Sequence, residues 1–271
     1  MIRDITIGQY YPTDSILHRL DPRVKLIGTF IFIVSLFLFN SLIGYIAVAL
    51  FLVSIIKLSK VPFSFIVRGL KAIVILLLFT MFFNLFFTPG KEIFRWSFIK
   101  ITEEGIRTAI FMGIRLTFLI LGSSLMTFTT TPNQLTDGLE KVMKPLKCIK
   151  VPVHEIAMMM SIALRFIPIL LEETDKIMKA QMARGADFES GGLMKRAKSL
   201  IPLLVPLFVS AFRRANDLAM AMEARCYRGG DGRTKMKPLH YHGRDYAAYL
   251  ILLLYLSVII TIGIAAKKGI I

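Results

Sequence analysis

Apolar residues run almost without interruption through the first half of the chain, and again near its end. A helix that crosses a bilayer needs about 20 apolar residues, with a working range of about 17–25. The run from Val24 to Ile56 has no charge after Lys25 and is just long enough for two helices. The pattern predicts five membrane-spanning helices, over Val24–Asn40, Ser41–Ile56, Ile66–Thr88, Gly105–Thr129 and Tyr246–Ala266.

Between Thr130 and Arg244 the apolar positions become periodic. From Val153 to Arg184, polar residues recur at helical spacing and form one stripe along a predicted helix. A second helix, from about Lys195 to Arg228, has an apolar centre too short to cross a membrane. A shorter amphipathic piece covers Pro132–Pro145. We expect these helices to lie on the inner leaflet or to pack on each other beneath it.

Methionine is concentrated in this periodic segment, which holds ten of the 14 Met residues of the chain. Methionine is flexible and polarisable, and it suits surfaces that must repack. The alternative is that these side chains fill a static core, and the sequence alone leaves both interpretations open.

Composition and charge agree with a membrane protein. Of the 271 residues, 55% are apolar and 19% are charged, whereas soluble domains have about 45–50% and about 25%. The net charge of +16 does not indicate nucleic-acid binding, because a nucleic-acid binder does not carry five apolar runs. Basic residues instead mark cytoplasmic segments of a protein in the lipid bilayer.

The basic residues predict an orientation and a domain organisation. They cluster before the first helix, between the second and third helices, and in Thr130–Arg244, so these segments and the N-terminus are expected in the cytoplasm. We expect an all-α, multi-pass protein of the cell membrane with three parts. These are an N-terminal segment with four spans (1–129), a cytoplasmic domain of long amphipathic coupling helices (130–244), and a last span with a short outer tail (245–271).

The loop between the third and fourth spans falls outside the cell in this orientation. Its residues Ile93–Ile101 alternate apolar and polar, which favours a small β-hairpin or an interfacial segment. Trp96 is the only tryptophan, and we expect it to anchor the loop at the membrane surface.

Catalytic and metal-binding motifs are absent from the sequence. No G-x-x-x-x-G-K-[ST] or H-E-x-x-H occurs, so we expect no enzyme activity, no cofactor and no metal in this chain. His240 and His242 flank Tyr241 in a basic loop, and a solvated pair is the expected interpretation. Arg115, in the fourth span, indicates either an intramembrane pair or snorkelling, or a contact with a partner.

The two long amphipathic helices end in similar motifs. One closes with Ala183-Arg184-Gly185 and the other with Ala224-Arg225-Cys226. Small neighbours let a partner backbone approach, and a guanidinium can bind a carboxylate through two hydrogen bonds. The alternative is simple capping, because cations are favoured at helix C-termini. The repetition of the motif favours two docking points.

At these residues the chain resembles the transmembrane T component of energy-coupling factor (ECF) transporters, which import vitamins and metal ions. The resemblance covers essentially the whole chain, and the two Ala-Arg motifs combined with the five-helix layout are its most specific part. The matching segments are Thr129–Pro132, Leu164–Pro168, Ala180–Phe188, Ala221–Gly230 and Arg233-Thr234.

The resemblance implies a function without catalysis in this chain. Two ATP-binding-cassette ATPase subunits are expected below the coupling helices, one held by Arg184 and the other by Arg225. A small membrane protein, the S component, is expected to bind the substrate. The T component then transmits the motion of the ATPases to the S component. The alternative is a stand-alone secondary transporter with its own substrate site.

Overall fold

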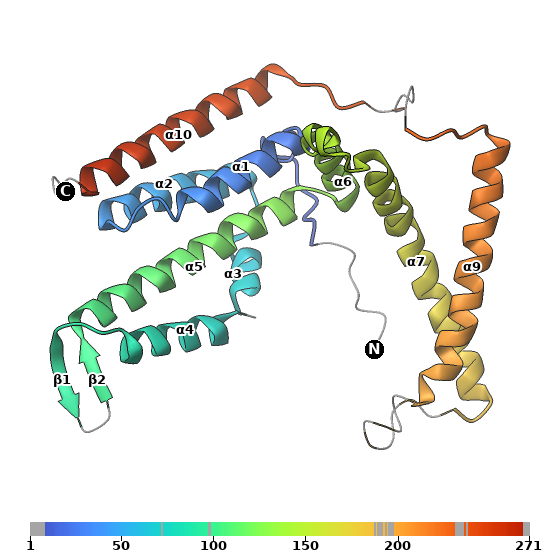
Figure 1. Ribbon diagram of the computed structural model, residues 1–271, viewed down its shortest axis with the longest axis horizontal. Helices are drawn as coiled ribbons and strands as arrows, with labels where there is room; N and C mark the ends of the chain where they lie inside the picture. Colours follow the sequence, from blue (N-terminus) through green and yellow to red (C-terminus); the bar gives the residue numbers. More distant parts are fainter. Residues whose placement is uncertain are drawn as a thin grey trace. The chain divides into compact units, whose positions relative to one another are not determined.

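A computed structural model describes residues 9–71, 73–96, 99–186, 198–230 and 238–267, and the single residues 188, 192, 194 and 236. These residues are almost entirely helical (Figure 1). The helices in chain order are α1 (Pro22–Ser35), α2 (Leu42–Ser59), α3 (Phe63–Lys71), α4 (Val74–Phe87), α5 (Glu103–Thr129), α6 (Pro132–Val142), the 3-10 helix η1 (Lys144–Ile149), α7 (Val153–Ala183), α9 (Ile201–Ala224) and α10 (Gly243–Lys267). A two-stranded hairpin, β1 (Glu92–Trp96) and β2 (Ile99–Thr102), precedes α5.

The described chain forms two compact units. The first contains residues 9–142 and 239–267, with helices α1–α6 and α10, and the second contains residues 143–230, with η1, α7 and α9. These limits differ from the expected boundaries at residues 130 and 245, because α6 belongs to the first unit. Gly138 allows the close approach of α6 to α1: a Cβ atom there would lie 3.0 Å from the Cβ atom of Pro22.

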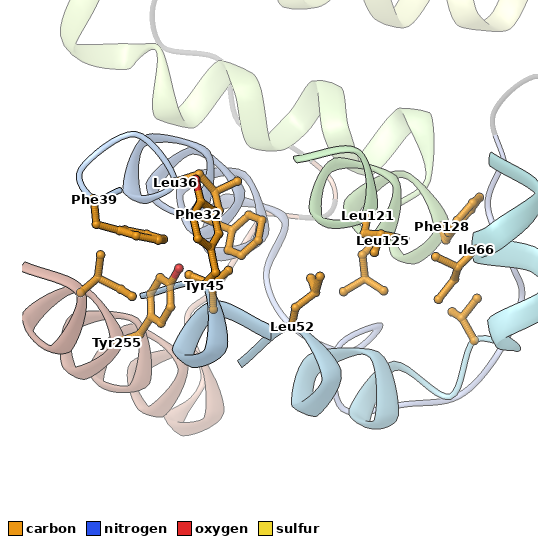
Figure 2. Close-up of a cluster of buried hydrophobic side chains, with 13 residues drawn as sticks. Phe32, Leu36, Phe39, Tyr45, Leu52, Ile66, Leu121, Leu125, Phe128 and Tyr255 are labelled. Atoms are coloured by element: carbon orange, nitrogen blue, oxygen red, sulfur yellow. The ribbon is translucent and has the colours of Figure 1, made fainter. Parts of the chain in front are cut away.

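The core of the first unit lies where α1, α2, α5 and α10 meet (Figure 2). The Tyr255 ring of α10 stacks on the Phe51 ring of α2, with their centroids 4.0 Å apart. The Tyr255 hydroxyl lies 2.7 Å from the hydroxyl of Ser35, so a polar group in an apolar core has a hydrogen-bond partner. Gly122 lets α5 reach α1, because a Cβ atom there would lie 2.3 Å from the Phe32 ring.

The expected spans correspond to helices, with one correction. The segment Ile66–Thr88 was predicted as a single helix, but it is divided between α3 and α4. The division separates an amphipathic segment, which buries Ile66 in the core, from a uniformly apolar one. Among the described residues, four helices are long and apolar enough to cross a membrane, by length and composition alone: α2, α5, α7 and α10. With 14 residues each, α1 and α4 are shorter than the expected spans.

The loop before α5 forms the β-hairpin that its alternating sequence predicted. Strands β1 and β2 pair antiparallel, with Arg95 opposite Lys100. The side chain of Trp96 lies outside the described part of the structure, so its role as an anchor stays a prediction. The hairpin leads directly into α5, whose N-cap Thr102 accepts a hydrogen bond from the N–H of Gly105 at 3.0 Å.

Candidate docking site

The two Ala-Arg motifs end their helices in the same way. Arg184 is the C-terminal cap of α7. Beyond it, the N–H of Gly185 donates to the carbonyl of Met182 (2.9 Å), and the N–H of Ala186 donates to the carbonyl of Gln181 (3.0 Å). This pair of bonds defines a Schellman motif, which satisfies carbonyls at the helix end and turns the chain away.

Arg225 is the C-terminal cap of α9 and has the same surroundings. The N–H of Cys226 donates to the carbonyl of Glu223 (2.8 Å), and the N–H of Tyr227 donates to the carbonyl of Met222 (3.0 Å). In both motifs the backbone makes the capping hydrogen bonds, so neither guanidinium is needed for them. Both arginine side chains are exposed, and within the described chain no side chain pairs with either of them.

The helices α7 and α9 pack against each other and run antiparallel (Figure 1). Glu173 of α7 holds the pair together near its middle: it accepts hydrogen bonds from Arg214 Nη2 at 2.9 Å and from the hydroxyl of Ser210, both on α9. Because the helices are antiparallel, their C-terminal ends lie at opposite ends of the pair. Arg184 and Arg225 are therefore separate points on the helix pair, each at an exposed helix end.

Pro168 lies inside α7, and Pro206 lies inside α9. Both helices continue through their prolines, although proline removes one backbone hydrogen bond and favours a bend. The Met-rich faces expected from the sequence remain largely open: Met159, Met160 and Met220 are exposed.

An arginine-lined pocket of about 540 Å³ opens beside the second motif. It lies between the N-terminal half of α7 and the C-terminal end of α9. Arg165 of α7 lines one side, and Arg225 and Arg228 line the other. Sequence patterning placed Arg165 only in the polar stripe of α7, because its proximity to Arg225 depends on the packing of two helices.

Arg115 lies on α5 in the first unit, and its hydrogen bonds are made within the chain. Its Nη2 atom donates to the carbonyl of Phe39 at 3.3 Å and to the side-chain oxygen of Asn40. Its guanidinium also lies 5.4 Å from the centre of the Phe37 ring. The arginine thus ties α5 to the turn between α1 and α2.

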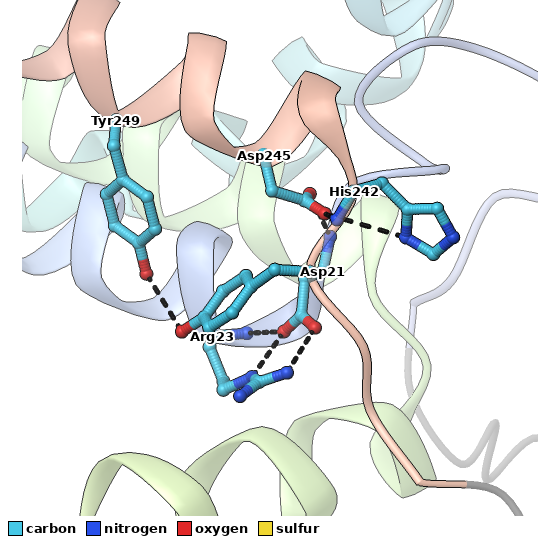
Figure 3. A network of polar contacts seen from close by, with 6 residues as sticks. Asp21, Arg23, His242, Asp245 and Tyr249 are labelled. Atoms are coloured by element: carbon cyan, nitrogen blue, oxygen red, sulfur yellow. Dashed lines mark hydrogen bonds and ion pairs between the residues drawn. The ribbon is translucent and has the colours of Figure 1, made fainter.

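A polar junction, defined here as Asp21, Arg23, His242, Asp245 and Tyr249, links the start of α1 to the start of α10 (Figure 3). The buried carboxylate of Asp245 accepts from the N–H of Asp21 at 2.9 Å and from the N–H of His242 at 2.8 Å. Asp21 also pairs with Arg23 at 2.9 Å.

The sequence analysis did not identify this junction. Its local signal is Asp21-Pro22, an N-cap residue followed by proline at the first helical position. Within the described residues, no cluster of three or more His, Cys, Asp or Glu side chains forms a metal site, and His242 instead lies 3.8 Å from Asp245.

Comparisons with known proteins agree with the helical arrangement. The family model described as CbiQ, cobalt transport protein, matches residues 13–236. The energy-coupling factor transporter transmembrane protein EcfT of Clostridium kluyveri is 58% identical over 260 residues, which cover 95% of this chain and 96% of that protein. EcfT proteins of Ruminiclostridium cellulolyticum and Bacillus subtilis are 55% and 51% identical, and cover 96% and 93% of this chain and 97% and 96% of their own lengths. The chain is therefore a multi-pass membrane protein that belongs to the CbiQ and EcfT family of transporter components.

Proposed function

We propose that this chain couples two ATPase subunits to a substrate-binding S component. The observation that carries the proposal is the pair of matching helix ends at Arg184 and Arg225. Each presents an exposed guanidinium beyond a backbone-capped helix, and the two lie at opposite ends of the α7–α9 pair. Two separate points of this kind suit two separate subunits.

ATP hydrolysis belongs to the partner subunits in this proposal, because the chain has no P-loop. ATP binding draws the two ATPases together and displaces the ends of α7 and α9. The apolar faces of these helices then slide, and the surface beneath the S component changes shape. A ligand shifts a conformational equilibrium only by its differential affinity for the two states, and the docked arginines supply that difference.

The proposed orientation places the second unit and the N-terminus in the cytoplasm. Helix α7 is long and apolar enough to cross a membrane, but its C-terminal half carries Glu172, Glu173, Asp175, Lys176 and Lys179. Charged side chains at the bilayer centre are costly. An in-plane or submembrane position for α7 keeps these charges in water.

The alternative, a secondary transporter with its own substrate site, has less support. Such proteins carry ionisable residues or broken helices near the middle of the membrane. In α5 and α10, the acidic residues lie in the first turn, and α1, α2 and α4 have none. Arg115 already bonds to the turn between α1 and α2.

Replacement of the two motif arginines tests the proposal. Arg184→Ala and Arg225→Ala, singly and together, are co-expressed with the two ATPases and the S component, and subunit recovery and substrate uptake are measured. A lone helix-end charge contributes about 0.3–1 kcal/mol, whereas truncation of one side of a desolvated interfacial pair costs about 2–5 kcal/mol. Each single variant is expected to fold but to lose one ATPase, and the double variant to lose both.

Conservative and control substitutions serve as comparisons. Arg→Lys at either motif is expected to restore binding only in part, because an ammonium does not reproduce the bidentate guanidinium. Arg213→Ala, an exposed position in the middle of α9, serves as the matched control and should bind both ATPases. Normal assembly and uptake by the double alanine variant would overturn the assignment of these arginines.

A further inference from the structure

The pocket beside Arg225 is cationic on both sides. Arg165 faces it from α7, and Arg225 and Arg228 line it from the end of α9 and the segment that follows. No acidic side chain is among the described residues that line it. Arginine stays protonated at any physiological pH, so the pocket carries uncompensated positive charge in water.

Much of the remaining wall of the pocket is apolar, and Ser161 and Tyr227 add polar side chains to it. Its lining between the arginines includes Met158, Ile162, Leu218 and Met222. Thioether and aliphatic side chains fill irregular gaps and adapt to the shape of a ligand. A pocket of about 540 Å³ with this lining accommodates one or two side chains of a partner. The combination of apolar walls with guanidiniums matches a carboxylate next to an apolar side chain, since guanidinium and carboxylate pair through two parallel hydrogen bonds.

Among the described residues, further arginines gather at the second motif end. Arg225 shares a pocket with two further arginines, whereas Arg184 is not part of that pocket. The backbone geometry of the two helix ends is nevertheless the same. Positive charge gathered at a helix end provides a means to favour one partner over another, because charge complementarity contributes more to the specificity of an interface than to its affinity.

We propose that Arg165 and Arg228 complete the docking site of Arg225, and that this three-arginine pocket selects an ATPase subunit whose docking segment carries an acidic residue beside an apolar one. The inference rests on the proposed function, since it assumes that an ATPase binds at Arg225. It adds that Arg165, which lies on α7 and far from Arg225 in the sequence, is a specificity residue for that subunit.

Charge reversal at Arg165 tests the inference. Arg165→Glu, Arg165→Lys and Arg225→Ala are produced in the complex with both ATPases, each carrying a different tag. Lys179→Glu is the matched control, because Lys179 is exposed on α7 and does not line the pocket. We expect Arg165→Glu to reduce recovery of the ATPase that Arg225→Ala loses by about tenfold or more, and to leave the other ATPase bound. Arg165→Lys keeps the positive charge, so it tests whether the effect of Arg165→Glu comes from charge and not from misfolding. This variant should retain that ATPase better than Arg165→Glu does, but should release it at a lower salt concentration than the wild type.

The outcomes separate the two proposals. If Arg225→Ala loses one ATPase while both Arg165 variants and Lys179→Glu retain it, the three-arginine pocket is overturned and the proposed function stands. If neither Arg184→Ala nor Arg225→Ala loses an ATPase, the proposed function itself fails. Loss of both ATPases from a monodisperse Arg165→Glu protein would overturn selectivity. If native mass spectrometry shows that Arg165→Glu loses phosphatidylglycerol that the wild type binds, and both ATPases are retained, the pocket binds lipid and the proposal is overturned.

Discussion

Gly185 and Cys226 occupy the same left-handed backbone position, one residue after the arginine that caps each coupling helix, with φ values of 88° and 56°. The structure gives this position a definite role, because the Schellman motif requires a residue in the left-handed region here. Glycine adopts that region without steric cost, whereas cysteine does not.

This relationship predicts opposite effects of two substitutions on stability. Cys226→Gly relieves the left-handed strain and should stabilise the second unit by about 1 kcal/mol, whereas Gly185→Ala should destabilise it by a similar amount. A Cβ atom at Gly185 meets nothing within 4 Å, so the effect of Gly185→Ala reports backbone conformation and not a clash. Thermal unfolding of the purified protein measures both changes. Equal melting temperatures for the wild type and the two variants would contradict the capping argument.

The hydrogen bonds of Glu173 to α9 allow a test of helix sliding. Cys148 and Cys226 are exposed and are first replaced, so that the background has no free thiol. Cysteines at Glu173 and Ser210, which are in hydrogen-bond contact, are then joined with a short thiol crosslinker. If the helices slide during transport, the crosslinked complex assembles but does not transport. Normal uptake by the crosslinked complex, compared with either single-cysteine variant, would mean that α7 and α9 move as a rigid body.

The regular elements could largely be predicted from the sequence, because their signals are local. The stripe between Val153 and Arg184 predicted α7, which ends at Ala183, and the alternation in Ile93–Ile101 predicted the hairpin. The division between α3 and α4 was missed, because the prediction joined the amphipathic α3 to the uniformly apolar α4, and packing of Ile66 determines where α3 lies.

The candidate site could be predicted only in part. Arg184 and Arg225 stand out because each follows Ala at the end of a predicted helix. Arg165 does not, because its place beside Arg225 depends on the antiparallel packing of α7 on α9. The docking role of Ala183, Arg184, Gly185, Ala224, Arg225 and Cys226 stays a prediction, and so does any partner contact of Arg115.

The expected topology can be checked by thiol labelling in intact cells. In the cysteine-free background, a cysteine at Lys91 lies in the loop expected outside, and one at Gly192 lies between the two coupling helices. Both positions are exposed. A membrane-impermeant maleimide should label the first and not the second, until the cells are permeabilised. Labelling of Gly192→Cys in intact cells would show that α7 crosses the membrane.

His18 predicts a pH dependence of stability. Its Nε2 atom lies 3.0 Å from the carbonyl of Tyr11, and its Nδ1 atom lies 2.7 Å from the hydroxyl of Ser15. Partial burial lowers the pKa of His18 from 6.5. Because the unfolded chain binds the proton more tightly, the contribution of His18 is complete above pH 6.5 and is lost as the pH falls below this value and through the lower pKa of the folded protein. The melting temperature should fall more from pH 7.5 to 5.5 for the wild type than for His18→Gln, with exposed His240→Gln as the control. Parallel changes in all three proteins would exclude this role of His18.

The strongest prediction for stability concerns Asp245, whose side chain is only 1% exposed. Its two carboxylate oxygens accept from the N–H groups of Asp21 and His242, so both are used as acceptors. In Asp245→Asn, one of these oxygens becomes an NH₂ group that faces an N–H donor. A buried donor without an acceptor costs about 1–3 kcal/mol, and more where a charged group is replaced, so the melting temperature should fall clearly. Asp14→Asn is the matched control, because Asp14 pairs with Arg19 at an exposed site, where ion pairs contribute little to stability. A loss of stability no larger for Asp245→Asn than for Asp14→Asn would mean that the junction does not hold α10 to the start of α1.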